Sequence, residues 1–152
     1  MKLQRDLREF IELLNSHGID YVVVGGHAVA YHGHPRFTGD IDFLVRPTQQ
    51  NGARLVEALR AFGFSELSLA AEDFVKPESI VQLGRPPNRI DLLTSISAVS
   101  FEEAWSSRVH ADLDGLPVAF LGLDELLKNK QASGRPKDVA DAAVLLARAR
   151  KR

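Results

Sequence analysis

Two aspartates separated by a single residue, Asp40 and Asp42, are the first candidates for chemistry in this chain. On a strand, side chains two residues apart point to the same face, which places the two carboxylates about 7 Å apart. Carboxylates aimed at one point repel each other unless a cation lies between them. Hard divalent ions such as Mg²⁺ take oxygen ligands of this kind together with substrate phosphates. The pattern therefore indicates metal-assisted phosphoryl chemistry.

A third acid, Asp91, stands between Ile90 and Leu92 in an apolar stretch that is typical of a buried strand. A charged side chain is costly there unless it is paired or bound to a metal. Three acids on neighbouring strands would suit a two-metal phosphoryl-transfer site. A second Asp-x-Asp, Asp112 and Asp114, is better explained by a hairpin turn. The Asp-x-Asp spacing alone is therefore weak evidence. Its combination with a third acid on a neighbouring strand is more specific.

Gly25 and Gly26 follow the apolar run 21–24 and provide a complementary part of such a site. At a strand-to-helix turn, glycines let backbone N–H groups approach a phosphate closely, and the helix N-terminus favours its negative charge. Thirteen residues separate Gly26 from Asp40, which leaves room for one short helix and a return. We therefore expect the phosphate-binding turn and the acids to share one end of a sheet.

The remaining pattern predicts the elements that position these residues. Helical spacing, caps and breakers predict helices over 3–14, 27–31, 49–62 (with Thr48 as N-cap), 101–105, 124–132 and 136–150. Short β-branched runs predict strands over 21–24, 41–45, 79–83, 89–94, 108–113 and 116–121, the last two joined by an Asp-Gly hairpin. The order predicts an α/β (α+β) fold in one domain, residues 1–152. A mixed sheet flanked by helices occupies 19–121, and a pair of helices occupies 123–150.

Composition narrows the class of protein. The chain has 152 residues, 45% of them hydrophobic and 26% charged, which excludes disordered and collagen-like proteins. It has no cysteine, so disulfides, Cys-based zinc sites and thiol catalysis are excluded. Acidic residues interrupt the first turns where a signal peptide needs an apolar core, and no apolar run could span a bilayer. We expect a soluble cytoplasmic protein with no membrane partner.

Charge is unevenly distributed along the chain. From Lys128 onward there are eight Lys or Arg and two Asp, a net charge of +6, against −7 for the residues before it. Such a basic end could meet a phosphate-rich ligand, but its last residues are equally typical of a solvated helix end.

The combination of strand-Gly-Gly, strand-Asp-Ile-Asp-Phe and strand-Ile-Asp-Leu resembles the DNA polymerase β-like nucleotidyltransferase superfamily. Within that superfamily, residues 25–43, 126–130 and 134–141 look like the small bacterial nucleotidyltransferases related to AbiEii-type toxins. The resemblance covers roughly 19–146. One departure is Gly26, where many members have a serine, so that any hydroxyl contact to a phosphate at this position is missing.

The resemblance implies a Mg²⁺-dependent transfer of a nucleoside monophosphate from an NTP to an acceptor, with Mn²⁺ as a substitute ion. The residues that match the catalytic and metal-binding acids are Asp40, Asp42 and Asp91. The matches for substrate binding are the turn Gly25 and Gly26 and the basic residues Lys130, Arg135 and Lys137. Arg36 and Thr38, just before the acids, are further substrate-contact candidates, although Thr38 could equally hold its loop by a backbone hydrogen bond.

Several alternatives stay open at this point. The acceptor could be RNA, a protein hydroxyl or a small molecule. A different class of function is an NTP-binding regulatory or toxin–antitoxin module, with a cognate antitoxin as partner and little or no turnover. The presence of all three acids favours the enzyme, since a pure binding module gains nothing from their repulsion. A metal-dependent phosphohydrolase is a third alternative. His32 and His34 have metal-ligand spacing, but their turn favours hydrogen-bonding roles.

Overall fold

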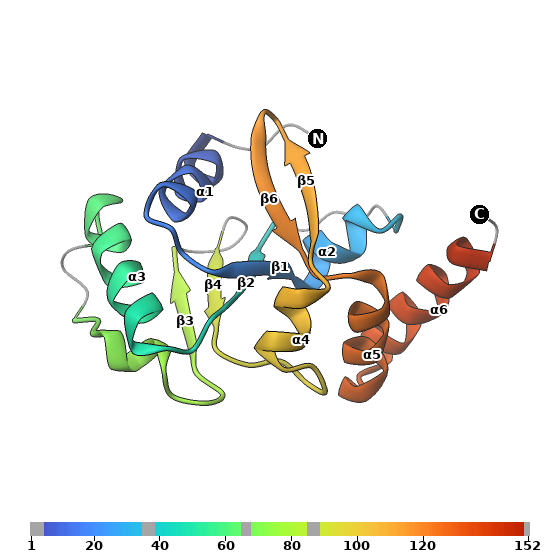
Figure 1. The fold of residues 1–152 in the computed structure, drawn as a ribbon. Helices are drawn as coiled ribbons and strands as arrows, with labels where there is room; N and C mark the ends of the chain where they lie inside the picture. Colours follow the sequence, from blue (N-terminus) through green and yellow to red (C-terminus); the bar gives the residue numbers. More distant parts are fainter. Residues whose placement is uncertain (1–4, 35–38, 65–67, 85–88, 151–152) are drawn as a thin grey trace.

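A six-stranded mixed sheet forms the centre of the computed structural model, which describes residues 5–34, 39–64, 68–84 and 89–150 (Figure 1). The strands are β1 (Tyr21–Val24), β2 (Ile41–Val45), β3 (Ile80–Leu83), β4 (Ile90–Leu93), β5 (Val109–Leu113) and β6 (Leu116–Phe120). Their order across the sheet is β3-β4-β2-β1-β6-β5. β1 pairs with β6, and β2 with β4, in parallel, whereas the other pairs are antiparallel.

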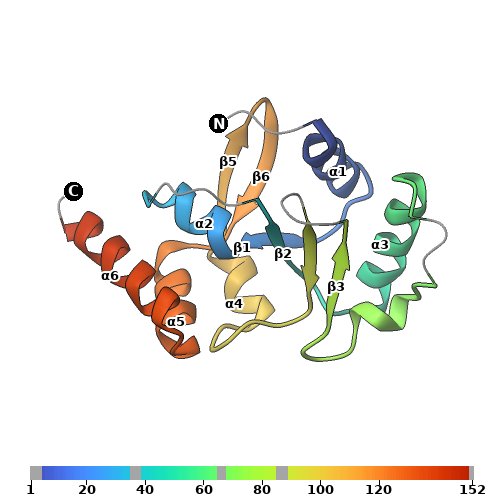
Figure 2. The ribbon, with the colours of Figure 1, turned by 180° about the vertical axis from the view of Figure 1, so that it is seen from behind.

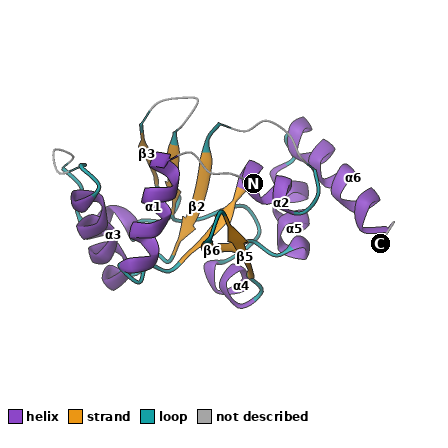
Figure 3. Ribbon diagram, turned by 90° about the horizontal axis from the view of Figure 1, so that it is seen from above, coloured by secondary structure: helices purple, strands orange, loops and turns teal. Residues whose placement is uncertain are grey.

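Helices cover both faces of this sheet. They are α1 (Arg5–Ser16), α2 (Gly25–Tyr31), α3 (Gln49–Ala61), α4 (Phe101–Ser106), α5 (Leu123–Ser133) and α6 (Pro136–Arg150), with a 3₁₀ turn, η1, over Ala71–Phe74. Seen from above, α1 and α3 lie on one side of the sheet, α2, α5 and α6 lie on the other, and α4 lies beside β5 and β6 (Figure 3). α3 and α6 lie toward opposite ends of the molecule (Figures 1 and 2). None of the helices in the described ranges is long and apolar enough to cross a membrane.

Alternation along β2 decides which residues enter the core. Phe43 is fully buried and packs against Phe10 of α1, with ring centroids 5.7 Å apart. Asp42, one residue earlier, therefore points to the opposite face, which carries α2 and the C-terminal helices. Hydrophobic packing of one face thus presents the acids on the other.

The predicted fold class is confirmed: the fold is a mixed sheet flanked by helices and followed by a helical pair. The side chain of Thr48 accepts a hydrogen bond from the backbone N–H of Asn51 as the N-cap of α3, and Asp114-Gly115 turns the β5–β6 hairpin. Several strand and helix ends differ from the predicted ones by one residue, and the start of α2 differs by two. α2 begins at Gly25 directly after β1, not at His27, because Gly25 adopts a positive φ that lets the chain enter the helix at once. The 3₁₀ turn η1 was not predicted.

Candidate active site

The structure brings the three candidate aspartates together at one end of the central strands. β2 and β4 are parallel neighbours, and Asp42 stands opposite Asp91 in their register. Asp40 precedes β2 by one residue, so it lies two residues before Asp42. The adjacent end of β1 contributes Val24, opposite Asp42, and the chain continues into Gly25. The acids and the Gly-Gly turn consequently share one end of the sheet.

Arg89, which the sequence reasoning did not single out, lies among these acids. Its Nε and Nη2 donate to the two carboxylate oxygens of Asp91 at 2.8 and 3.2 Å. Nη2 also lies 3.3 Å from Oδ2 of Asp40, whose Oδ1 accepts from the Arg89 backbone N–H at 3.2 Å. The signal that could have found it is the alternation of an extended chain, because residue 89, directly before β4, lies two residues from Asp91 and so shares its face.

Asp42 is an acid of the cluster whose pKa is raised. Burial raises the pKa of its carboxyl to about 6, helped by the charge of Asp91, a hydrogen bond to Asp91 and the charge of Asp40. The positive charge of Arg89 opposes this shift without cancelling it. Repulsion among the carboxylates thus adds to burial in raising this pKa, and a further cation beside them would lower it.

This shift predicts that Asp42 costs stability at neutral pH. Its folded pKa of about 6 exceeds the ordinary value of 3.8, so the folded protein binds more protons between these values. The contribution of Asp42 to wild-type stability should therefore fall as the pH rises from about 4 to 6, and stay lowered above that range. In urea unfolding, Asp42→Asn should gain on the order of 2 kcal/mol relative to wild type between pH 4 and pH 7.5. A pH-independent difference would contradict the assignment.

Gly25 is the residue on which the position of Asp42 depends. Its φ is +67°, a conformation that favours glycine. A Cβ at this position would lie 2.2 Å from Oδ2 of Asp42, well inside van der Waals contact. Backbone and carboxylate can approach this closely only because residue 25 has no side chain. Gly26 follows in the first turn of α2 and also lines the cavity beside the acids.

We therefore expect Gly25→Ala to damage the site more than the backbone strain alone would. Gly18 provides a matched control, because its φ is +65° and a Cβ there would meet nothing within 4 Å. Both alanine variants should lose about 1–2 kcal/mol for the left-handed conformation, and only Gly25→Ala must also displace Asp42. The measurement is urea unfolding together with nucleotide binding. Equal losses in the two variants, with nucleotide binding intact, would contradict the role of Gly25.

The basic residues of the C-terminal helices form a second cluster. Lys130 is buried, and its Nζ donates to Oδ1 of Asp138 at 2.9 Å and lies 3.6 Å from Oδ2 of Asp141. Asp138 also accepts from Ser133 at 2.6 Å and from Arg135 at 2.9 Å. Burial alone would raise the pKa of Asp138, but these hydrogen bonds and the charges of Lys130 and Arg135 lower it to about 2. This network joins α5 to α6.

One cavity of about 540 Å³ is lined by both the aspartate cluster and the basic cluster of the C-terminal region. The site residues from the sequence analysis that line it are Gly25, Gly26, Asp40, Asp42, Asp91, Lys130, Arg135 and Lys137. Ser97 and Asn129 also contribute, and the Asn129 amide donates to the Ser97 carbonyl at 3.1 Å, which ties α5 to the segment after β4. Arg135 and Lys137 are exposed, so their charges face solvent at the cavity. The predicted contacts Arg36 and Thr38 lie outside the described residues.

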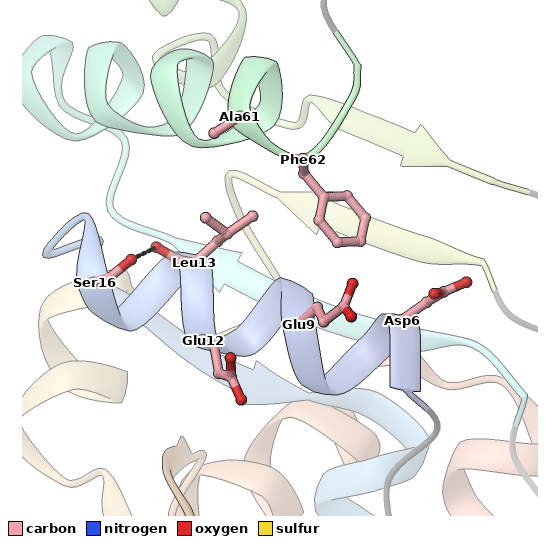
Figure 4. A pocket seen from close by; sticks show the side chains of 7 residues that line it. All are labelled: Asp6, Glu9, Glu12, Leu13, Ser16, Ala61 and Phe62. Carbon is pink, nitrogen blue, oxygen red and sulfur yellow. Dashed lines mark hydrogen bonds between the residues drawn. The ribbon is translucent and has the colours of Figure 1, made fainter.

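A second hollow, of about 630 Å³, lies between α1 and the end of α3 (Figure 4). Asp6, Glu9, Glu12 and Leu13 of α1 line it together with Phe62, and Glu9 and Leu13 point toward α3 whereas Glu12 points away from it. Glu9 is 3.2 Å from Arg5 and Glu12 is 3.3 Å from Arg8, so two of its three acids are paired on their own helix. It lies on the face of the sheet away from the three aspartates and contributes nothing to their chemistry.

The histidines near the site have structural contacts. Nε2 of His32 is 2.7 Å from the Leu121 carbonyl, which connects α2 to the segment before α5. Nε2 of His34 is 3.7 Å from Oδ1 of Asp141. Burial lowers the pKa of His27, although a backbone contact and the charge of Asp40 oppose that shift. Hydrogen bonding and packing, the roles expected for the His-x-His turn, therefore account for His32 and His34.

The donor set of the cluster fits a hard divalent ion. Asp40, Asp42 and Asp91 supply carboxylate oxygens, the ligands that Mg²⁺ and Mn²⁺ prefer. The charges of Asp91 and Asp40 add to burial in raising the pKa of Asp42. Within the described ranges, no group of three His, Asp or Glu side chains is arranged to hold a metal as it stands. Arg89 contacts two of these acids, Asp40 and Asp91.

Comparison with solved structures gives the same fold. The Thermotoga maritima protein TM1012 is 17% identical with a TM-score of 0.59, covering 97% of this chain and 92% of its own. The lincosamide antibiotic adenylyltransferase LnuA, solved with lincomycin bound, is 14% identical with a TM-score of 0.55, covering 95% and 96%. The antibiotic-resistance factor ANT(2'')-Ia is 13% identical with a TM-score of 0.53, covering 96% and 90%. These likenesses show a shared nucleotidyltransferase architecture.

The sequence itself carries the family assignment. A comparison with curated proteins finds no match. A family model described as "Nucleotidyltransferase of unknown function (DUF6036)" matches residues 2–146, nearly the whole chain. The predicted resemblance to nucleotidyltransferases is therefore confirmed at the level of this family, and the chain belongs to the DUF6036 nucleotidyltransferases.

Proposed function

We propose that this nucleotidyltransferase moves a nucleoside monophosphate from an NTP to a hydroxyl-bearing acceptor in the cavity beside Asp42. The observation that carries the proposal is the lining of that cavity. Three carboxylates and the Gly-Gly turn come from the sheet region and α2. Arg135, between α5 and α6, and Lys137, in the first turn of α6, line the same cavity. A triphosphate substrate needs both the basic residues and the carboxylates. The basic residues stabilise the charge of its phosphates, and the carboxylates act where the acceptor attacks the α-phosphorus.

The proposed reaction exchanges one bond at the α-phosphorus for another. The acceptor oxygen forms a bond to the α-phosphorus, the bond from that phosphorus to the bridging oxygen of pyrophosphate breaks, and pyrophosphate leaves. The acceptor proton passes to Asp91, which acts as general base. Arg135 and Lys137 balance the charge that develops on the leaving pyrophosphate. The Gly25-Gly26 turn holds the phosphates close to the backbone.

Asp40, Asp42 and Asp91 are the residues that would hold a divalent ion. Once bound, Mg²⁺ or Mn²⁺ would supply a Lewis acid that screens the triphosphate and lowers the pKa of the acceptor hydroxyl. The repulsion from Asp91 and Asp40 that helps to raise the pKa of Asp42 supports this assignment.

Thermal unfolding with each NTP, with and without Mg²⁺, tests the donor half of the proposal. A nucleotide at a hundred times its dissociation constant should stabilise the fold by about 2.7 kcal/mol, a shift of several degrees at this size. We expect the shift to require Mg²⁺ and to disappear in the double variant Asp40→Asn/Asp42→Asn. If the folded wild-type protein shows no rise in unfolding temperature with any of the NTPs, the proposal is refuted.

Transfer itself needs a second assay, in which the NTP with the largest shift carries a label on its α-phosphate. RNA, protein and small hydroxyl compounds are offered as acceptors. Lincomycin is included because LnuA was solved with it bound. Label attached to one acceptor, with release of pyrophosphate, supports the proposal. Release of γ-phosphate without attachment identifies a phosphohydrolase, and binding without either reaction identifies a regulatory module.

A further inference from the structure

Arg89 spans two of the three acids that the proposed reaction needs. Its guanidinium contacts both oxygens of Asp91 and one oxygen of Asp40, at 2.8 to 3.3 Å. We infer that Arg89 is a built-in counter-ion that a divalent cation must displace from Asp40 and Asp91, so that metal binding and release of this arginine are coupled. This inference rests on the proposed function, because it concerns the same carboxylates.

The backbone of Arg89 is held in place, which leaves its side chain as the part that moves. The Arg89 carbonyl accepts from the Ile41 N–H at 3.0 Å, and its N–H donates to Asp40 at 3.2 Å. Its side chain is 28% exposed and lines the cavity, so it can leave the carboxylates without crossing the core. An arginine packed inside the sheet could not exchange in this way.

Geometry and charge both argue for competition. The guanidinium lies against Asp40 and Asp91 at once, and in the part of the chain that the structure describes no trio of acids or histidines is arranged to hold a metal. The N–H donors of a guanidinium occupy carboxylate oxygens by hydrogen bonding, and the guanidinium has no acceptor atom with which to bind a metal itself. Its positive charge also repels a second cation from oxygens that it already contacts. The acids can take a metal as shared ligands only when those contacts open.

A merely positioning role for Arg89 makes the opposite prediction. If the fork only orients Asp91 while a metal uses the remaining lone pairs, removing it should loosen the carboxylate and weaken metal binding. If the arginine competes, removing it should strengthen metal binding. The sign of one measured change therefore separates the two roles.

The experiment is a titration of the whole protein with Mn²⁺, followed by electron paramagnetic resonance of the unbound ion, without nucleotide and again with the NTP that binds best. We expect Arg89→Gln to bind Mn²⁺ about tenfold more tightly than wild type without nucleotide, as the loss of charge-assisted hydrogen bonds suggests. Arg89→Lys, which keeps the charge but not the fork, should fall between them. Arg54→Gln removes an exposed positive charge from α3, across the sheet, and should match wild type.

Circular dichroism first establishes that each variant is folded, and Arg89→Lys carries the test if Arg89→Gln is not. Weaker or unchanged Mn²⁺ binding in the folded Arg89 variants overturns the inference. If wild type binds Mn²⁺ only with nucleotide and Arg89→Gln gains no affinity, the inference fails while the proposed function stands. If neither protein binds Mn²⁺ with or without an NTP, both fail together.

Discussion

Replacing Asp91 by asparagine is expected to abolish nucleotidyl transfer while nucleotide binding stays largely intact. The asparagine amide cannot take the acceptor proton, and loss of a general base lowers rates by about 10²- to 10⁴-fold. The triphosphate contacts proposed for Gly25, Gly26 and Lys137 do not involve this residue. The measurement is the rate of α-phosphate transfer, beside the thermal shift produced by the same NTP.

The chain contains its own control for this substitution. Asp112 belongs to the second Asp-x-Asp, in the β5–β6 hairpin, and its Oδ1 accepts from the Gly115 N–H at 2.8 Å. Asp112→Asn keeps that acceptor and should leave transfer unchanged. Asp91→Asn also takes one acceptor oxygen from the Arg89 fork, so its unfolding curve must be measured as well. Wild-type transfer rates in folded Asp91→Asn would rule out the proposed general base.

The largest effect on stability is expected for Lys130→Met. Lys130, Asp138 and Asp141 are all buried, with side-chain exposures of 7%, 6% and 4%. Removing one partner of a buried ion pair leaves an uncompensated charge and costs about 3–5 kcal/mol. For a chain of this length we expect the Tm to fall by on the order of 10 °C. Calorimetry or a thermal melt monitored by circular dichroism checks the prediction.

Lys128, on the same helix, is the matched control. It is about half exposed and forms a surface ion pair with Glu103 at 3.2 Å, an interaction worth little in water. Lys128→Met should therefore shift the Tm by no more than a few degrees. Adding Asp138→Asn and Asp141→Asn to Lys130→Met removes the stranded charges and should recover part of the loss. Equal effects of the Lys128 and Lys130 substitutions would show that the network does not hold α5 to α6.

The same network bears on the prediction that Lys130 contacts the triphosphate. The resemblance implies a basic residue at this place, and the structure puts Lys130 at the cavity with its ammonium engaged by Asp138 and Asp141. Arg135 and Lys137 are exposed at the cavity, so contacting a phosphate costs them less free energy than it costs the buried Lys130. A direct contact from Lys130 stays a prediction, and what the structure shows is its place between the two helices.

Local signals were sufficient for most of the elements. Apolar β-branched runs marked β1 and β2, Thr48 marked the start of α3, and Asp114-Gly115 marked a hairpin, because each depends on neighbours within a few residues. The start of α2 was misjudged for a tertiary reason. Gly25 enters the helix directly through its positive φ, and a side chain there would meet Asp42, seventeen residues later.

By itself, the amino-acid sequence determined the fold class, the family and the acids that carry the proposed chemistry, since these are written in periodicity and in residue types at fixed spacing. The tertiary structure alone decided which groups meet. The parallel register of β2 and β4 sets Asp42 opposite Asp91, and the return of α6 onto α5 buries Lys130 between two aspartates. Strand pairing and helix packing join residues distant along the chain, and ionic partners follow from that packing rather than from local sequence.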